Sequence, residues 1–409
     1  MTNAEDPAVT ALHPALPSAP PSAAGRHAAA TSTRLGLGAA SVLLLALGAA
    51  WLEAQHGWRL AALWLVGAGL GFVLHRTAFT FAGGFRALLT ESRTRAMRAQ
   101  LLLLGLGAVL FLPTFALAPA WGLQVGGMIA PAGAATALGA FLFGIGMHWA
   151  GACVSGTLFC AGAGSPPAWL AIPFAVAGAT LAAATGGFWS GLPALPPVSL
   201  QGLLGTAPAL ALILGLLWLA WAGLVTLERR RTGAVEPLFG SRQGLSPFAW
   251  GAAALALLNL ATLLVAGRPW GIVAAFPLWG SRLIGDLGLD DPLFWAWWEE
   301  QGRSARLLAP LTADRFGVMT VALVIGAGLS AALTGRMLTS RPLTLRAAAG
   351  AAFGGTLLGF GAILAGGCNI SAYVSGIASG SLHGWLWIAS ALAGYATALG
   401  LARRLGRGV

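Results

Sequence analysis

The sequence predicts an all-α polytopic membrane protein with about ten membrane-spanning helices, additional re-entrant half helices and an inverted pseudo-repeat. Of its 409 residues, 57% are hydrophobic and only 9% are charged, and the mean hydropathy is +0.79. Soluble domains carry about 25% charged residues. Several apolar runs reach the roughly 20 residues that cross a bilayer. Helices are the expected spanning elements because each satisfies its own backbone polar groups.

The apolar runs give the order of the expected elements along the chain. Long apolar segments fall near 35–54, 58–75, 99–118, 132–150, 167–187, 205–227, 248–267, 316–335, 345–365 and 382–402. Shorter Gly-rich pieces lie between them at 77–90, 153–164, 269–283 and 368–380. These pieces are too short to span a bilayer and too apolar for surface loops, so we expect re-entrant or half helices there.

Composition also divides the chain into a tail and one transmembrane domain. Residues 1–34 are rich in Ala, Pro, Ser and Thr without a long apolar core, which is typical of a disordered cytoplasmic tail and not of a signal peptide. The transmembrane domain then covers 35–409. Its first half runs over about 35–227 and its second over about 248–409, with a linker at 228–247.

The distribution of positive charge predicts the orientation in a bacterial inner membrane. The net charge is +11, and all 23 basic residues are arginine. In a soluble protein this charge would suggest nucleic acid, but in this chain it is better read as topology information, so no nucleic-acid partner is expected. If each long run crosses once and both termini are cytoplasmic, 17 arginines lie inside and six outside. The six are Arg59, Arg268, Arg282, Arg303, Arg306 and Arg315.

The segment DLGLDDPLFWAWWEE, at 286–300, then lies on the outer side. Its Trp295, Trp297 and Trp298 suit a membrane interface, where amphipathic rings are favourable. Its acidic residues argue against an anion funnel at that place. We therefore expect an interfacial loop without a ligand.

An internal repeat contains two of the three cysteines. GAFLFGIGMHWAGAC, at 139–153, aligns with GGTLLGFGAILAGGC, at 354–368, at a constant offset of 215 residues and with seven of fifteen positions identical. In the expected topology the two units cross in opposite directions, and glycine permits a break before each cysteine. This pattern favours an inverted repeat of discontinuous helices, as in secondary transporters. The alternative is a glycine packing face with buried, inert cysteines.

If the helices break there, Cys153 and Cys368 open half helices whose free N–H groups favour anions. Ser155 and Asn369 can add hydrogen-bond donors. A thiol is weakly hydrated and suits a soft, sulfur-bearing ligand. No metal or cofactor is expected, because no CxxC pair or zinc spacing is present. The remaining candidates on this path are the glycines at the breaks, Gly151, Gly366 and Gly367.

The motifs together resemble the YeeE/YedE sulfur-transport family. The resemblance lies in GIGMHWAGACVSGTLF and GFGAILAGGCNISAYVSG, in HRTAFTFAGGFR at 75–86, and in GRPWGIVAAFPLWG and DRFGVMTVALVIGAGLSAALTGR further on. It implies thiosulfate uptake through a series of cysteines, with Cys153 and Cys368 as the central relay residues. The family's first cysteine falls on Thr80, whose hydroxyl can contact an anion but not through sulfur.

Other residues have weaker roles in this interpretation. Cys160 does not fall where the family has a thiol. Arg76 and Arg86 flank the Thr80 segment and either guide an exiting anion or anchor the topology. The expected partners are thiosulfate or a similar anion, the lipid bilayer and a cytoplasmic sulfur-carrier protein. The alternatives are transport of another sulfur or selenium species, or a membrane scaffold subunit. An enzyme is not expected, because a thiol enzyme needs a base, a second thiol or a cofactor site.

Overall fold

The computed structural model describes residues 24–240, 246–300, 303–338 and 343–404, and it is almost entirely helical. Ten helices in this part of the chain are long and apolar enough to cross a bilayer. The long helices are α2 (Ala24–His56), α3 (Trp58–Thr77), α5 (Arg95–Leu117), α6 (Ala134–Trp149), α8 (Pro166–Ala184), α11 (Thr206–Thr232), α12 (Pro247–Ala266), α16 (Arg315–Thr334), α17 (Leu345–Leu364) and α19 (His383–Arg404). The predicted all-α class and the number of candidate membrane-spanning helices are confirmed.

Short helices occupy the Gly-rich pieces between the long ones. They are α4 (Phe81–Glu91), α7 (Val154–Gly162), η2 (Ile272–Ala275) with α13 (Phe276–Asp286), and η6 (Asn369–Ser375) with α18 (Gly376–Ala378). The remaining elements are η1 (Ala118–Trp121), β1 (Ala132–Gly133), α9 (Gly186–Ser190), β2 (Ala194–Leu195), α10 (Leu200–Leu204), η3 (Pro292–Phe294), α14 (Ala296–Glu299), α15 (Ser304–Leu308) and η5 (Leu311–Ala313). The two short strands pair antiparallel, with Ala132 opposite Leu195.

The predicted boundary between the tail and the transmembrane domain falls within a helix. Helix α2 begins at Ala24, so residues 24–34 of the predicted tail are helical. This helix continues without a break into the apolar run that begins at Leu35. Extending an existing helix costs less free energy than starting a new one, so the residues before the apolar run join it. The prediction for residues 1–23 lies outside the described residues.

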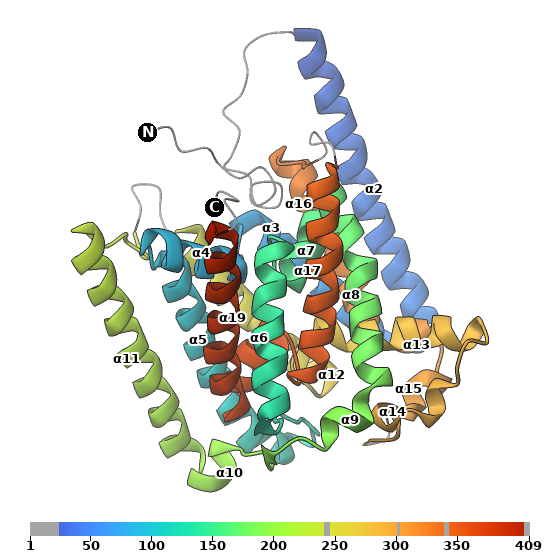
Figure 1. The fold of residues 1–409 in the computed structure, drawn as a ribbon. Coiled ribbons are helices and arrows are strands. Elements are labelled where there is room, and N and C mark those ends of the chain that lie inside the picture. Colours follow the sequence, from blue (N-terminus) through green and yellow to red (C-terminus); the bar gives the residue numbers. More distant parts are fainter. Residues whose placement is uncertain (1–23, 241–245, 301–302, 339–342, 405–409) are drawn as a thin grey trace.

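Helices α6, α8, α17 and α19 pack side by side in the centre of the molecule (Figure 1). Glycines allow this close packing. A Cβ on Gly139 of α6 would lie 2.7 Å from the carbonyl oxygen of Gly361 on α17. A Cβ on Gly146 would lie 2.9 Å from the carbonyl oxygen of Gly354. Since the residue number rises along one helix as it falls along the other, α6 and α17 are antiparallel.

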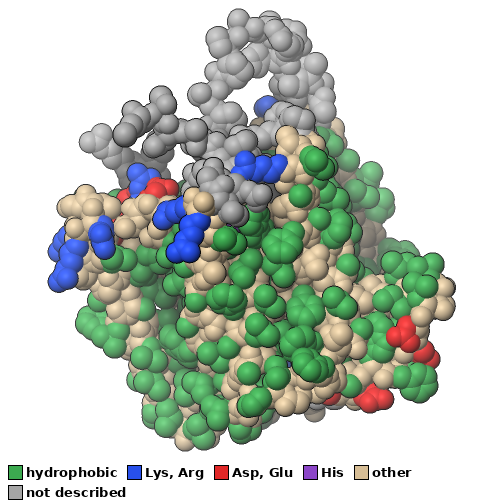
Figure 2. Space-filling view, in the orientation of Figure 1, with side chains coloured by type: hydrophobic (Ala, Val, Ile, Leu, Met, Phe, Trp, Pro, Cys, Tyr) green, Lys and Arg blue, Asp and Glu red, His purple; other side chains and the backbone are tan. Residues whose placement is uncertain are grey.

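Charged side chains separate between the two ends of the helix bundle. Arginine side chains gather at the end where α11 and α19 finish, and a group of acidic side chains lies near α13 towards the opposite end (Figure 2). Near the arginine-rich end, Arg98 of α5 donates to Glu228 of α11 at 3.0 Å, and both side chains are buried. Thr94 also donates to the Glu228 carboxylate. A buried charge is tolerated when it is paired and hydrogen-bonded, so this cluster fixes α11 to α5.

Candidate functional site

Three of the short helices begin at a residue predicted to lie on the path. Thr80, Cys153 and Cys368 are the N-cap residues of α4, α7 and η6, and each has extended backbone angles. The Thr80 hydroxyl accepts from the N–H of Gly83 at 3.2 Å, and the Cys153 thiol accepts from the N–H of Gly156 at 3.4 Å. Thr80 therefore has the same local role as the two cysteines, although its side chain is an alcohol.

Cys153 lies in a compact polar group at the start of α7. Its side chain is 1% exposed, and its sulfur lies 3.2 Å from the hydroxyl oxygen of Ser155. The helical conformation is interrupted at Gly151, whose φ of 71° is a left-handed value that favours glycine. The predicted break between α6 and the next helix is therefore at this glycine, and Ser155 contacts the thiol.

Cys368 has a parallel arrangement in the second unit. Its N–H donates to the Ser371 hydroxyl at 2.9 Å, and that hydroxyl lies 3.7 Å from the Cys368 sulfur. Gly366 and Gly367 precede it with φ values of 72° and 150°. A Cβ on Gly367 would collide with Ser371, so only glycine leaves the helix start accessible there. The following seven residues form a π-helix, a conformation that often marks functional sites.

The three cysteines belong to one buried cluster. All of them are free, buried thiols within the main hydrophobic core. Cys160 lies further along α7, packed among apolar residues instead of at a helix start. The structure therefore places Cys153 and Cys368 at helix starts in the same core and leaves Cys160 in the hydrophobic packing of α7.

Asn369 follows Cys368 directly and has an unsatisfied side chain. It is 1% exposed, and neither atom of its amide group has a hydrogen-bond partner among the residues that the structure describes. Leaving such a group unsatisfied costs about 1–3 kcal/mol. A ligand or water at the start of η6 would offset this cost.

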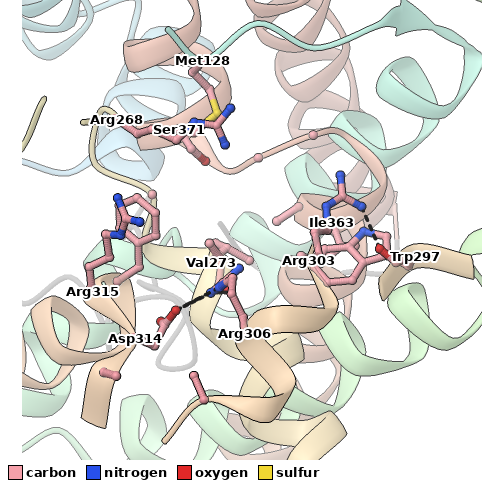
Figure 3. Close-up of a pocket in the computed structure, with 18 residues that line it drawn as sticks. Met128, Arg268, Val273, Trp297, Arg303, Arg306, Asp314, Arg315, Ile363 and Ser371 are labelled. Atoms are coloured by element: carbon pink, nitrogen blue, oxygen red, sulfur yellow. Dashed lines mark hydrogen bonds and ion pairs between the residues drawn. The ribbon is translucent and has the colours of Figure 1, made fainter. Parts of the chain in front are cut away.

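A cavity of about 390 Å³ opens beside the break before Cys368. Four arginines line it, together with Asp314 (Figure 3). They are Arg268, Arg303, Arg306 and Arg315. Gly366, Gly367 and Ser371 also line the cavity, so it reaches the turn that carries Cys368.

The partners of these arginines leave a positive excess in the cavity. Arg306 donates to Asp314 at 2.7 Å, whereas Arg315 donates to the backbone carbonyl of Ala266. Arg303 pairs with Glu300 at 3.2 Å and lies 4.5 Å from the ring centre of Trp297. No described carboxylate forms an ion pair with Arg268. The cavity is therefore suited to an anion.

Burial lowers the pKa of Arg303, and the nearby Arg306 and Arg268 lower it further, while Glu300 acts in the opposite direction. The ordinary arginine pKa is so high that the guanidinium stays charged near neutral pH. Like charges at close range repel one another, and an anion between them relieves that repulsion.

The 286–300 loop, which we expect to lie at the membrane interface without a ligand, contributes Trp297 to the lining of this cavity. Trp298 is fully buried and donates to the hydroxyl of Ser281 at 3.0 Å, so it holds the loop against α13 instead of anchoring it in lipid. Arg303 and Arg306, which follow this loop along the chain, line the cavity (Figure 3). The sequence did carry a signal: four of the six arginines assigned to the outer side, against the positive-inside trend, line this cavity.

Thr80 and its flanking arginines lie elsewhere. Neither Thr80, Arg76 nor Arg86 lines the cavity. Arg76 is exposed in the last turn of α3, and Arg86 is partly buried on α4. The predicted path residues therefore fall into two groups, one at the cavity and the cysteines and the other at α4.

Aromatic side chains connect these two groups. Phe81, which follows Thr80, packs edge-on against Tyr373 of η6, with 6.2 Å between ring centres. Tyr373 stacks on Trp387, whose indole N–H donates to the carbonyl of Gly367 at 2.9 Å. All three rings are buried. This apolar wall lies between the Thr80 helix start and the glycines before Cys368.

Comparison with known proteins agrees with these motifs. A model of the sulphur transport family matches residues 76–397. The chain is 28% identical over 356 residues to the thiosulfate transporter TsuA of Spirochaeta thermophila, covering 79% of this chain and 92% of that protein. It is 29% identical over 360 residues to TsuA of Escherichia coli K12, covering 82% and 92%.

A shorter similarity links the chain to the probable transporter YedE of Escherichia coli K12, with 34% identity over 137 residues and 31% of each chain covered. The family match extends over most of the chain and includes Thr80, both cysteine units and all four arginines that line the cavity. The protein therefore belongs to the sulphur transport family.

Proposed function

We propose that this protein takes up thiosulfate across the bacterial inner membrane. Membership of the sulphur transport family and similarity to two thiosulfate transporters over about four fifths of the chain support the substrate class. Thiosulfate is a dianion with a hard sulfonate end and a soft terminal sulfur. The candidate site offers both kinds of partner, guanidinium groups in the cavity and thiols behind it.

The observation that carries the proposal is the arginine-lined cavity that ends at Gly366, Gly367 and Ser371. A dianion loses water as it enters the cavity, and guanidinium groups replace part of its hydration with charge-assisted hydrogen bonds. The turn before Cys368 forms the inner end of the cavity. The next partner on the path is therefore the Cys368 thiol, assisted by Asn369 and Ser371.

The anion then passes from Cys368 to Cys153 and on towards Thr80. A neutral thiol donates a weak hydrogen bond to the terminal sulfur or to a sulfonate oxygen, whereas a thiolate would repel the dianion. Ser155 beside Cys153 and the hydroxyl of Thr80 supply further donors. Successive weak sites favour passage, because one tight site would trap the ion.

The helix arrangement supports an inverted repeat around this relay. Gly139 contacts Gly361 and Gly146 contacts Gly354, and the offset of 215 that pairs 139 with 354 also pairs 146 with 361. Exchanging the two repeat units therefore converts the Gly139–Gly361 contact into the Gly146–Gly354 contact, as expected when a two-fold axis relates the units. The antiparallel course of α6 and α17 agrees with units of opposite orientation.

The orientation follows from charge. The arginine-rich end that includes the ends of α11 and α19 is assigned to the cytoplasm, and the cavity then faces outward. A membrane-impermeant thiol reagent should label a cysteine introduced in the 286–300 loop in intact cells. It should label one in the 229–240 segment only after lysis. The reverse pattern would contradict the assigned direction of transport.

Uptake of labelled thiosulfate by vesicles that contain the purified protein tests the function. We expect saturable uptake that unlabelled thiosulfate blocks and sulfate blocks weakly, because sulfate lacks the soft terminal sulfur. Equal competition by sulfate would contradict selection through thiols. Stronger competition by a selenium-containing anion would identify that class as the substrate. A cytoplasmic sulfur-carrier partner stays a prediction, which co-purification with the membrane-embedded protein tests.

A further inference from the structure

We propose that Gln100 of α5 forms, together with Thr80, a polar binding site for the transported anion at the inner end of the path. The inference rests on the proposed function and adds a residue to which neither the sequence motifs nor the cavity assigns a role. Its ligand class is an oxyanion such as the sulfonate end of thiosulfate. Three independent observations on α4 and α5 carry it.

The first observation is that Gln100 is fully buried without being satisfied. Its side chain is 0% exposed, and its Oε1 has no hydrogen-bond partner within the described part of the chain. Its Nε2 makes one long bond, 3.5 Å to the carbonyl oxygen of Phe81. The second hydrogen on Nε2 therefore remains available for a ligand.

The second observation is that α4 is built to receive this side chain. A Cβ on Gly84 would lie 2.6 Å from the Gln100 Nε2, so glycine is required for the amide to approach the helix. The neighbouring Gly83 supplies the N–H that the Thr80 hydroxyl accepts. The two adjacent glycines of TFAGGFR thus have separate roles, one at the cap and one beside the amide.

The third observation concerns the relative placement of Thr80 and Gln100. Thr80 and Gly84 are four residues apart at the start of an 11-residue helix, so they lie on the same side of it. Gln100 contacts this side at Phe81 and Gly84. The Thr80 hydroxyl accepts from Gly83 and has no acceptor for its own hydrogen among the described residues.

Together these groups offer an anion several neutral donors. They are the Thr80 hydroxyl, the remaining Gln100 N–H and the free N–H groups of the first turn of α4. None of them is a full positive charge, so the anion is held weakly and leaves readily. The amide also accepts through Oε1 from a water that accompanies the anion. An apolar residue of similar shape would lack all of these contacts.

The test uses Gln100→Met, which keeps the length and volume but removes the amide. Thiosulfate flux is measured in right-side-out and inside-out membrane vesicles at matched protein level. We expect the half-saturation constant from the inner face to rise about 5- to 150-fold, the factor for loss of one buried polar contact. The constant from the outer face stays within about twofold, because a remote substitution acts independently.

A second variant protects the test against a folding defect of Gln100→Met. Gly84→Ala places a methyl group against the amide and moves it without removing it, so the inner-face constant should rise in the same direction. Gly105→Ala is the matched control on α5, because a Cβ there makes only ordinary contacts of 3.6 Å and longer. It should leave both constants unchanged.

A binding measurement completes the design. Thiosulfate should protect a Thr80→Cys variant from a thiol reagent, and adding Gln100→Met should raise the protecting concentration by the same factor as above. The proposal is overturned if Gln100→Met keeps the parent's half-saturation constant at the inner face and the parent's protecting thiosulfate concentration. It is also overturned if the half-saturation constants at the two faces change equally. If the parent transports no thiosulfate, the proposed function fails instead, and the two failures are distinguishable.

Discussion

The outer and inner ends of the proposed path offer different chemistry to an anion. At the outer end, four arginines surround a cavity of about 390 Å³. At the inner end, Thr80 and Gln100 offer neutral donors in close packing. Charge attracts a hydrated dianion from solution over a distance, whereas neutral donors act only in contact. We therefore propose that capture relies on charge, and that passage and release rely on weak contacts.

The strongest test of this contrast removes the thiols that connect the two ends. Cys153→Ala and Cys368→Ala should each reduce thiosulfate uptake to the level of vesicles without protein, since neither end can pass the anion across the buried segment between them. Labelled uptake at matched expression measures this. Cys160→Ala is the control and should transport like the parent. Normal uptake by either of the first two variants would rule out a relay through that thiol.

The next largest effect should come from the outer end. Arg268→Gln removes a guanidinium that has no described carboxylate partner. Hydrogen bonds to charged groups are worth about 1.5–3 kcal/mol, so we expect the outer half-saturation constant to rise roughly 10- to 150-fold. Arg59→Gln serves as the control, because Arg59 lies over the ring of Trp58 and does not line the cavity. A similar loss in both variants would mean that the cavity charge acts only through general attraction.

A smaller and more variable effect is expected at the inner end. Thr80→Val keeps the β-branched shape but removes the donor, so the transport rate should fall about 5- to 150-fold if passage at Thr80 limits transport. Thr80→Cys should retain activity, because a thiol fills the same N-cap position in the other two short helices. If the Thr80→Val variant takes up thiosulfate at the same rate as the parent, Thr80 acts only as a packing residue.

The smallest effect should be the response of the outer end to pH. Burial lowers the pKa of Arg303, but arginine stays charged between about pH 6 and pH 8 because its ordinary pKa is far above this range. The outer half-saturation constant should therefore be nearly constant over that range in the parent. A marked change would point to a titrating group at the cavity other than these arginines.

Much of the fold and part of the site are local properties that the sequence contains. Apolar runs of bilayer length predicted ten spanning helices because hydrophobicity and length are properties of each segment alone. The Gly-Cys units predicted the helix starts at Cys153 and Cys368, since left-handed φ values at Gly151 and Gly366 and an N-cap are decided within a few residues.

Tertiary structure alone decided which distant side chains meet. Arg268, Arg303 and Arg315 come from separate segments, and their convergence beside Gly367 depends on how the helices pack. The acidic residues of the 286–300 loop argued against an anion funnel, because the sequence does not show that Arg303 and Arg306, which follow this loop, line a cavity with Arg268 and Arg315.

Tertiary structure also decided the role of Gln100. No feature of its own segment distinguishes it from a polar residue on a lipid-covered helix. Its burial, its unsatisfied Oε1 and its approach to Phe81 and Gly84 make it a candidate ligand. The sequence thus determined the membrane class, the spanning helices and the positions of the thiols, because hydrophobicity, glycine and capping act locally. Packing decided the charge of the cavity and the composition of the inner site, because electrostatic and hydrogen-bond partners are set by distance in space and not along the chain.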